Sequence, residues 1–284
     1  MSARDDTRLV ITDLDGTLLD GETYDIAPAQ PGLVALRERR LSLVLCSSKT
    51  RAEMEPLARE LGLGAPLIVE NGGAIVLRAR MLPFLPPGGR RDGDRLVIPL
   101  GSTRSALLAA LDEVAEEAGV AVRSFAAMTP GEVAERTGLG REAATRALKR
   151  EWDEPFVVEP EGGAGTTARL EEAARRRGLR VTHGGRFYHL TGTSDKGLAV
   201  RMLLQLLPHD PHGRTVGLGD AANDLPMLEA VDRPIVMPRR DGTVDATLAA
   251  ALPGAERAPG PGPAGWSAAI LGVLAGEPLP RLPS

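Results

Sequence analysis

The sequence predicts an α/β fold in which a doubly wound parallel sheet carries an inserted α+β domain. Short apolar runs bounded by turn residues alternate with segments of helical periodicity, as in sheets whose strands are buried on both faces. The alternation stops near Leu82 and resumes near Gly192. We therefore expect residues 1–82 and 192–284 to form one core and residues 83–191 to form an inserted domain.

Five apolar runs are the expected strands of the core sheet, and four helical segments are its expected crossovers. The runs occupy residues 9–11, 41–46, 67–69, 216–218 and 235–237. The helical segments occupy residues 30–40, 50–61, 194–207 and 224–231. A Pro/Gly-rich segment at residues 253–265 is expected to link this core to a last helix that begins at Trp266.

The middle of the chain departs from this rhythm. A Pro/Gly-rich junction at residues 83–94 is followed by a strand and by a helix with apolar positions on one side, beginning near Ser102. Thr129 and Glu132 form a capping box with Pro130 at the first helical position, which predicts a second helix. Further helices are expected at residues 141–151 and 166–177, and strands at residues 156–159, 179–183 and 186–190.

Composition excludes several classes of function. The net charge is −4 and there is no block of basic residues, so the electrostatic footprint of a nucleic-acid-binding protein is missing. No apolar stretch approaches the ~20 residues that span a bilayer. The single cysteine, Cys46, cannot form an intramolecular disulfide and lies in an apolar run, so we expect a buried thiol in a cytoplasmic protein.

Two acids follow the first expected strand directly, in the segment DLDGTL at residues 13–18. The carboxyl ends of parallel strands open into the ligand crevice, and residues two apart in an extended chain point the same way, so Asp13 and Asp15 can both face it. Neighbouring carboxylates repel each other unless a cation or a shared proton lies between them, and hard oxygen ligands suit Mg²⁺. We expect Asp13 and Asp15 to be catalytic and to bind this ion.

A second acidic segment, GDAAND at residues 219–224, follows the fourth expected strand. Asp220 would complete the metal ligands, and Asp224 would bind the ion directly or stand behind a direct ligand. Ser47, at the end of the second strand, offers a hydroxyl and an N–H to a phosphate. Lys196, one of only three lysines, is a compact cation for a phosphoryl oxygen, and Asn223 is expected to orient the phosphate or Asp13.

The ordered set of DxDGT, Ser47, Lys196 and GDxxND resembles the haloacid dehalogenase superfamily of phosphatases over nearly the whole chain. The resemblance implies a Rossmann-like core with a large cap inserted after the third strand, in agreement with the break at Leu82. It also implies that the cap closes over the substrate and determines specificity.

Six further motifs are similar to those of the mannosyl-3-phosphoglycerate phosphatase family, which converts mannosyl-3-phosphoglycerate to the compatible solute mannosylglycerate. The motifs are SSKTRAE (47–53), VENGGA (69–74), MTPGEV (128–133), DEPF (153–156), GGRF (184–187) and PGPAGW (261–266). Most cap-bearing sugar phosphatases of the superfamily have Gly-Arg where this chain has Ser48-Lys49, which favours the narrower family. Gly131 departs from the helix former expected in the cap helix.

The expected reaction is two displacements at phosphorus. Asp13 attacks the phosphorus while Asp15 donates a proton to the leaving glycerate oxygen, and water then hydrolyses the aspartyl-phosphate with Asp15 as base. Mg²⁺, Lys196, Ser47 and backbone N–H groups are expected to stabilise the equatorial oxygens.

Substrate choice is expected to depend on the cap and on the mouth of the site. Gly184, Gly185 and Arg186 are candidates for binding the glycerate carboxylate, and Lys49 and Arg51 for binding other negative groups of the substrate. His183 and His189 are interpreted as packed polar residues. Alternative substrates are glucosyl-3-phosphoglycerate, sucrose phosphate and trehalose phosphate, and the rival classes are a phosphomutase and a regulator without catalytic activity.

Overall fold

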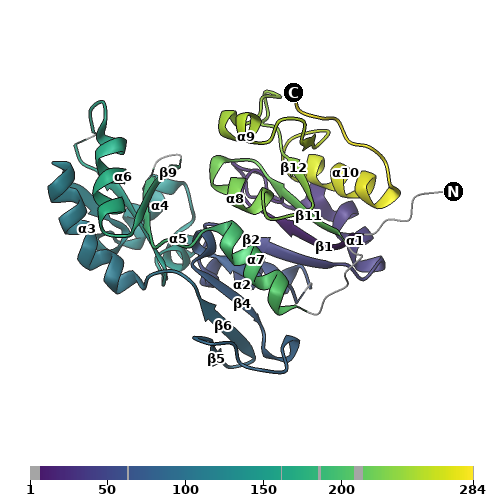
Figure 1. The fold of residues 1–284 in the computed structure, drawn as a ribbon, viewed down its shortest axis with the longest axis horizontal. Helices are drawn as coiled ribbons and strands as arrows, with labels where there is room; N and C mark the ends of the chain where they lie inside the picture. The colour runs from purple at the N-terminus through teal and green to yellow at the C-terminus, as the bar shows by residue number, and fades with distance from the viewer. Residues whose placement is uncertain (1–6, 63, 161, 185–186, 208–213, 284) are drawn as a thin grey trace.

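The computed structural model describes residues 7–62, 64–160, 162–184, 187–207 and 214–283. The described chain folds into two lobes, and the smaller one, which is built from the middle of the sequence, lies on the left in Figure 1. In the described part of the chain, no helix combines the length and apolar character that crossing a bilayer requires.

The larger lobe is built on a sheet that has nine strands among the described residues, in the order β13-β12-β11-β1-β2-β3-β4-β6-β5. The strands are β1 (Thr7–Thr12), β2 (Ser42–Cys46), β3 (Leu67–Val69), β4 (Ala74–Arg78), β5 (Arg90–Asp92), β6 (Arg95–Pro99), β11 (Arg214–Gly219), β12 (Arg233–Val236) and β13 (Glu256–Arg257). Neighbouring strands from β13 to β3 are parallel, and the pairs β3–β4, β4–β6 and β5–β6 are antiparallel. The five apolar runs expected from the sequence all lie in the parallel part.

Helices cover both faces of this sheet, as a doubly wound fold requires. On one face lie α1 (Gln30–Glu38), α2 (Arg51–Glu60) and α10 (Gly262–Ala275), whose residues Leu33, Met54 and Trp266 share a buried cluster with Val10 and Leu45. On the other face lie α7 (Lys196–Leu206), α8 (Leu225–Leu228) and α9 (Ala246–Ala251), which bury Val200, Leu228 and Leu248 against Ile11 and Val44. The predicted α/β fold class is confirmed.

The smaller lobe is an antiparallel sheet with helices on both of its faces. Its described strands pair in the order β7-β8-β10-β9, and they are β7 (Val122–Ser124), β8 (Asp153–Val158), β9 (Arg180–Gly184) and β10 (Phe187–Thr191). Helices α3 (Arg104–Ala118) and α6 (Thr166–Arg176) pack on one face around Phe156 and Leu190. Helices α4 (Pro130–Thr137) and α5 (Arg141–Ala147) pack beside Phe125 and Phe187 on the other. Short 3₁₀ helices complete the fold: η1 (Ala27–Ala29), η2 (Glu70–Gly72), η3 (Ala79–Met81), η4 (Phe125–Ala127) and η5 (Ala222–Asp224).

Several helix ends differ from the expected ones, and their caps explain why. Helix α10 begins at Gly262, because Pro263 fits the first turn of a helix, where its missing N–H needs no partner. The N-cap of α3 is Thr103, one residue after the expected Ser102. Its side chain accepts a hydrogen bond from the backbone N–H of Ala106. The capping box of Thr129 and Glu132 at the start of α4 is confirmed.

Strands β5 and β6 lie inside the range expected for the insertion, yet they extend the larger sheet beyond β4. The smaller sheet is built from strands that lie between Val122 and Thr191. The division of the chain at residues 82/83 and 191/192 stays a prediction.

Candidate active site

The candidate site lies where three neighbouring parallel strands end at the same edge of the larger sheet. Thr12, the last residue of β1, pairs with Leu218 of β11 on one side and with Leu45 of β2 on the other. Asp13, Ser47 and Asp220, which follow these strands directly, therefore leave the sheet together. The backbone N–H of Asp13 still donates to the carbonyl of Leu218 at 2.9 Å, so the nucleophile candidate is fixed by the sheet itself.

Gly16 lets the chain turn sharply after Asp13 and Asp15, the two acids that follow β1. Its φ is +82°, and a Cβ at this position would lie 2.5 Å from Asp220 Oδ2. An L-residue would therefore combine a strained backbone with a direct clash. This glycine allows the loop after β1 to lie against the loop after β11, where Thr17 Oγ1 also donates to Asp220 Oδ1 at 3.3 Å.

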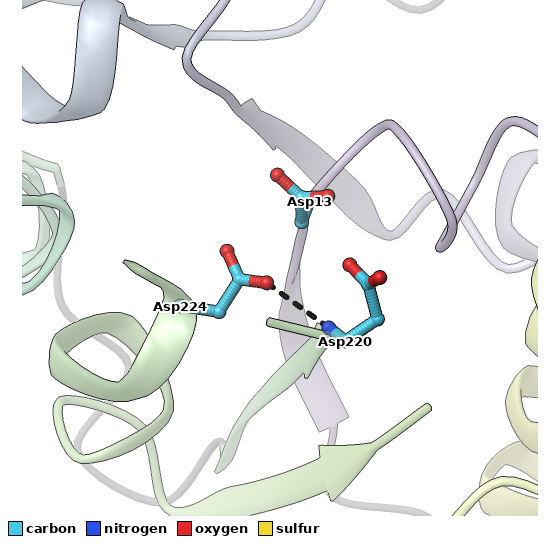
Figure 2. Close-up of side chains that lie close together, drawn as sticks. All are labelled: Asp13, Asp220 and Asp224. Atoms are coloured by element: carbon cyan, nitrogen blue, oxygen red, sulfur yellow. Dashed lines mark hydrogen bonds between the residues drawn. The ribbon is translucent and has the colours of Figure 1, made fainter. Parts of the chain in front are cut away.

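Three carboxylates gather at this edge, as Figure 2 shows. Asp13, Asp220 and Asp224 each offer an oxygen, and these oxygens all lie within 4.8 Å of one another. Asp224 Oδ2 accepts the backbone N–H groups of Asp220 at 3.0 Å and Ala221 at 3.1 Å, which closes the loop that carries the second acidic segment. The group is buried enough, and rich enough in carboxylate oxygen, to suit a divalent cation.

Lys196 reaches this cluster from α7, on the face of the sheet that α7, α8 and α9 cover. Its Nζ lies 2.6 Å from Asp13 Oδ1 and 2.5 Å from Asp224 Oδ1, and its side chain is 1% exposed. Burial alone would lower the pKa of Lys196, but the carboxylates of Asp13 and Asp224 raise it well above the usual value. The amine is therefore a permanent cation directly beside Asp13.

One lysine does not balance three acids. Burial, followed by repulsion from Asp224, raises the pKa of Asp13 well above its usual value. The same two causes raise the pKa of Asp220 to about 7. Carboxylates whose charge is this costly are those that a cation would stabilise, so the donor set fits a divalent metal.

Gly72 fixes the position of Lys196, the first residue of α7. The φ of Gly72 is +89°, and a Cβ there would lie 2.1 Å from the carbonyl oxygen of Asp195. The turn after β3 thus lies directly against the start of α7. Asp195 caps this helix by accepting the backbone N–H of Leu198 at 2.7 Å.

Asp15 lies beside the cluster rather than in it. Its Oδ2 pairs with Lys49 Nζ at 2.8 Å, and Lys49 also lies over the Tyr24 ring, 4.7 Å from the centroid. Its Oδ1 is buried and has no hydrogen-bond partner among the described residues. That oxygen is free to bind a ligand or to carry a proton.

The expected phosphate-binding residues lie around the same site. Ser47 is 1% exposed, and its Oγ accepts the backbone N–H of Lys49 at 3.2 Å, which orients the hydroxyl. Asn223 donates through Nδ2 to Asn71 Oδ1 at 3.2 Å, so the loops after β11 and β3 are joined beside it.

These residues line a cavity of about 510 Å³ between the two lobes. The core contributes Asp13, Asp15, Ser47, Asp220 and Asn223, and the smaller lobe contributes Thr182, His183 and His189. Ser48, Asn71, Ala221, Ala222, Arg239 and Asp245 complete the lining. The volume lies in the range of small-molecule sites, about 300–1,000 Å³.

The structure brings only some of the expected substrate-binding residues to this cavity. Lys49 reaches Asp15, whereas Arg51 pairs with Glu55 at 2.8 Å and with Asp92 at 2.5 Å and lines a separate cavity of about 230 Å³. Arg51 is thus engaged at the outer side of α2 by a partner from β5. Gly184 ends β9, and Gly185 and Arg186 lie outside the described residues.

The two histidines expected to be packed polar residues belong to the cavity lining. His183 stacks on Tyr188 with ring centroids 4.3 Å apart, and His189 is held by Asp153 at 2.9 Å. The alternation of side chains along β10 could have indicated that His189 lines the cavity. Leu190 joins the apolar core, so the neighbouring His189 side chain lies on the opposite face of the strand. Nothing in the sequence marks Arg239 and Asp245, which form an ion pair at 3.1 Å and also line the cavity.

Comparisons with known proteins agree on one family. Residues 10–82 match the family model of haloacid dehalogenase-like hydrolases. A Methanococcoides burtonii protein named glucosyl-3-phosphoglycerate/mannosyl-3-phosphoglycerate phosphatase is 37% identical over 267 residues, covering 94% of this chain and 97% of the relative. A Pyrococcus furiosus protein named mannosyl-3-phosphoglycerate phosphatase is 36% identical over 226 residues, covering 79% of this chain and 88% of the relative.

A solved structure shows the same fold at lower identity. The crystal structure of a haloacid dehalogenase-like hydrolase from Bacteroides thetaiotaomicron superimposes with a TM-score of 0.62 and 19% identity, covering 94% of this chain and 98% of that chain. At this identity the likeness supports the fold and nothing finer.

Proposed function

Because the chain belongs to the mannosyl-3-phosphoglycerate phosphatase family of haloacid dehalogenase-like hydrolases, we propose that it hydrolyses mannosyl-3-phosphoglycerate to mannosylglycerate and phosphate. The observation that carries the chemistry is the contact of Lys196 with Asp13 at the end of β1, beside Asp220 and Asp224. A candidate nucleophile, a buried cation and carboxylate oxygens suited to a metal thus lie together at one edge of the sheet, which supports this chemistry.

Mg²⁺ is the proposed metal, because carboxylate ligands with room for water suit it. Asp13 and Asp220 are the proposed side-chain ligands, and Asp15, whose Oδ2 pairs with Lys49 and whose Oδ1 serves proton transfer, would bind through its backbone carbonyl oxygen. Both oxygens of Asp224 already accept hydrogen bonds, so we assign Asp224 to holding Lys196 and the loop after β11 beside the ion. When bound, Mg²⁺ would neutralise charge on the phosphoryl oxygens and on the surrounding carboxylates.

The chain's own residues divide the reaction into two displacements. Asp13 attacks phosphorus to form an aspartyl-phosphate. The positive charge of Lys196 offsets the negative charge of Asp13 and of the phosphoryl oxygens during this step. Asp15 carries the proton for the leaving oxygen on Oδ1, because Lys49 already engages Oδ2. In the second displacement the same Oδ1 takes a proton from the attacking water, and inorganic phosphate leaves.

Ser47 and Asn223 are the proposed phosphate-orienting residues. The Ser47 hydroxyl and the backbone around it face the cavity near the start of α2, where N–H groups and the helix dipole favour an anion. Asn223, tied to Asn71, would direct its side chain to the phosphate or to Asp13. Both act by position, which phosphoryl transfer depends on.

The segment 83–191 is the proposed cap that selects the substrate, with the smaller sheet facing the cavity. Thr182, His183 and His189 supply the cap side of the cavity lining. Gly184, Gly185 and Arg186 remain candidates for the glycerate carboxylate, and Lys49 for a negative group at the mouth. The buried lone cysteine, Cys46, supports the proposed cytoplasmic location.

A second substrate is favoured by one specific observation. The Methanococcoides burtonii relative is named for both glucosyl- and mannosyl-3-phosphoglycerate, and it matches this chain over nearly the full length of both proteins. Glucosyl-3-phosphoglycerate is therefore the first alternative, ahead of sucrose phosphate and trehalose phosphate.

The test is phosphate release from mannosyl- and glucosyl-3-phosphoglycerate, sucrose phosphate and trehalose phosphate, each with Mg²⁺ and with a chelator. We expect the highest kcat/KM for mannosyl-3-phosphoglycerate, and loss of turnover after chelation that added Mg²⁺ restores. A sugar phosphate without glycerate as the best substrate would refute the proposed substrate. Transfer of the phosphoryl group to another sugar, without free phosphate, would favour the phosphomutase.

A further inference from the structure

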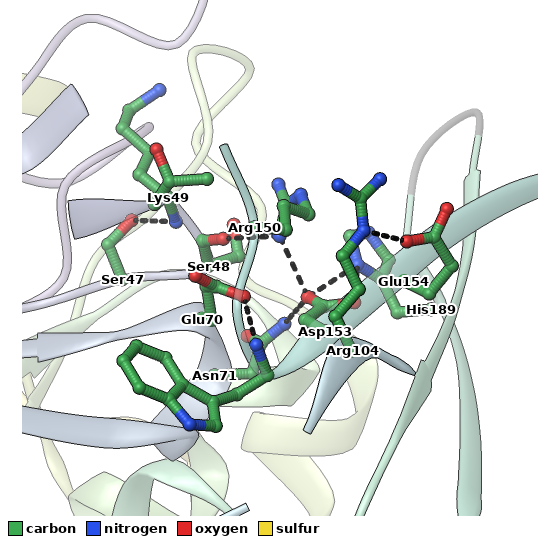
Figure 3. Close-up of polar contacts among 12 residues, drawn as sticks. Ser47, Ser48, Lys49, Glu70, Asn71, Arg104, Arg150, Asp153, Glu154 and His189 are labelled. Atoms are coloured by element: carbon green, nitrogen blue, oxygen red, sulfur yellow. Dashed lines mark hydrogen bonds and ion pairs between the residues drawn. The ribbon is translucent and has the colours of Figure 1, made fainter. Parts of the chain in front are cut away.

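A buried polar junction joins the smaller lobe to the core, and Asp153 is at its centre (Figure 3). The Asp153 side chain is fully buried and accepts from three partners at once. Arg150 Nη1 donates at 3.0 Å, Asn71 Nδ2 at 3.2 Å, and His189 Nδ1 lies 2.9 Å away. Asp153 belongs to the DEPF motif, which the proposed phosphatase chemistry does not use.

Two of these partners reach into the loops of the candidate site. Arg150 Nη1 also donates to the carbonyl of Ser48 at 3.1 Å, next to Ser47. Asn71 accepts from Asn223, three residues after Asp220. A single cap carboxylate is thereby tied to the loops after β2, β3 and β11, so its position relative to the phosphate site is fixed.

The third partner, His189, is oriented by Asp153. Burial would raise the pKa of Asp153, but the His189 ring and the Arg150 guanidinium lower it below its usual value, so the group is a carboxylate that only accepts. His189 Nδ1 must therefore carry a hydrogen and donate to it. The other ring nitrogen, Nε2, is left for a ligand, in the same way that carboxylates orient functional histidines elsewhere.

The sheet register places His189 over the cavity. In β10 it stands opposite Pro155 of β8 and Thr182 of β9, and Thr182 and His189 both line the cavity that Asp13 and Asp15 line from the core. A substrate whose phosphate lies at Asp13 extends from there into the part of the cavity formed by the smaller lobe.

We propose that His189 is a specificity residue whose Nε2 binds an anionic oxygen of the substrate beyond the scissile phosphate, and that Asp153 is the positioning residue that holds the ring. The substrate group of this chemistry is a carboxylate, and the inference rests on the proposed phosphatase function. A histidine between a buried carboxylate and a substrate carboxylate donates to both when it carries a hydrogen on each ring nitrogen, as an imidazolium, and each contact is then charge-assisted.

The test compares two variants of His189, each of which places a side-chain amide where one nitrogen of the ring was. In His189→Asn the amide can keep the hydrogen bond to Asp153 while nothing occupies the place of Nε2, whereas His189→Gln extends an amide towards that place. Activity is measured on mannosyl-3-phosphoglycerate and on p-nitrophenyl phosphate, which has no carboxylate. Glu154→Gln is the matched control, because Glu154 is an equally buried carboxylate on the opposite face of β8, where it accepts from Arg104 and from the Ala126 N–H.

We expect His189→Asn to raise KM for mannosyl-3-phosphoglycerate about tenfold, as for the loss of one hydrogen bond to a charged group, with kcat/KM for p-nitrophenyl phosphate within about twofold. His189→Gln should recover part of that loss. Glu154→Gln should leave the ratio of the two kcat/KM values unchanged even where it lowers Tm.

Asp153→Asn tests the positioning role. It should shift the same KM in the same direction, and adding it to His189→Asn should raise KM little further, because both changes remove one contact. Should Asp153→Asn fail to fold, the His189 pair alone decides. An unchanged KM in His189→Asn, or an equal loss on both substrates, overturns the inference. A wild-type protein that hydrolyses neither substrate overturns the proposed function and this inference with it.

Discussion

Glu70 is a buried acid outside the catalytic cluster, and its replacement by Gln should change how stability depends on pH. Glu70 is 1% exposed, and its carboxylate accepts the backbone N–H groups of Glu151 and Trp152 at 2.8–3.1 Å. Burial is the largest cause that raises its pKa from 4.5 to about 7, against the lowering effect of Arg150. Folding is therefore linked to a proton on this side chain.

The sign and size follow from that difference. Between pH 4.5 and 7 the folded chain holds a proton that the unfolded chain has released, so the free energy of unfolding falls as pH rises. The difference, about 2.5 pH units at ~1.4 kcal/mol each, corresponds to a loss of about 3 kcal/mol, complete above pH 7. Gln keeps an oxygen acceptor for the two N–H groups and does not titrate.

The assay is urea unfolding of wild type and Glu70→Gln between pH 4.5 and 8, followed by tryptophan fluorescence. Other buried acids, such as Asp220, titrate in both proteins and cancel in the difference between them. We expect the free energy of unfolding of wild type to fall by about 3 kcal/mol relative to that of the variant across this range. A difference between the two proteins that stays constant from pH 4.5 to 8 would refute the reasoning.

Three further predictions concern the site and its surroundings. Asp13→Asn should lower kcat roughly a thousandfold or more, because it removes the nucleophile, while circular dichroism stays unchanged; near wild-type turnover would contradict the mechanism. Gly16→Ala should lower the free energy of unfolding by about 1–2 kcal/mol through its positive φ, and should reduce phosphate release as well because its Cβ meets Asp220; an unaffected kcat would show that the loop adapts. Burial raises the pKa of Cys46, so its thiol should react with a disulfide reagent only after denaturation, and rapid labelling of the native protein would contradict this.

The fold class was predictable because the signals are local. The expected strands of the parallel part are short apolar runs, and the residue after each run is placed by the sheet edge alone, whereas the charged two-residue strand β13 (Glu256–Arg257) carries no such signal. Asp13, Ser47 and Asp220 could therefore be expected at one edge, and Lys196 lies with them because a glycine holds the start of its helix. The roles of these residues stay predictions that kinetics must test.

The remaining features depend on pairings between distant segments. Arg51 lies in the SSKTRAE motif and was therefore expected to bind substrate. Its partner Asp92 belongs to β5, a strand that could not be predicted from the Pro/Gly-rich composition of residues 83–94. The Asp153 junction joins Asn71, Arg150 and His189 to Asp153, and no local sequence pattern predicts contacts between segments this far apart. The start of α10 was concealed in the same way, because prolines that begin a helix resemble prolines in a linker.

The contact of Gly72 with the backbone of Asp195 bears on what happens when the smaller lobe changes its position. Only a few residues separate the end of β10 at Thr191 from Lys196, so a displacement of that lobe would pull on the amine through the chain. The turn after β3 lies against the backbone of Asp195 just before the helix begins, so any bending of the chain would be confined to the residues before Asp195. The ammonium group would consequently keep its distance from Asp13 during such a displacement.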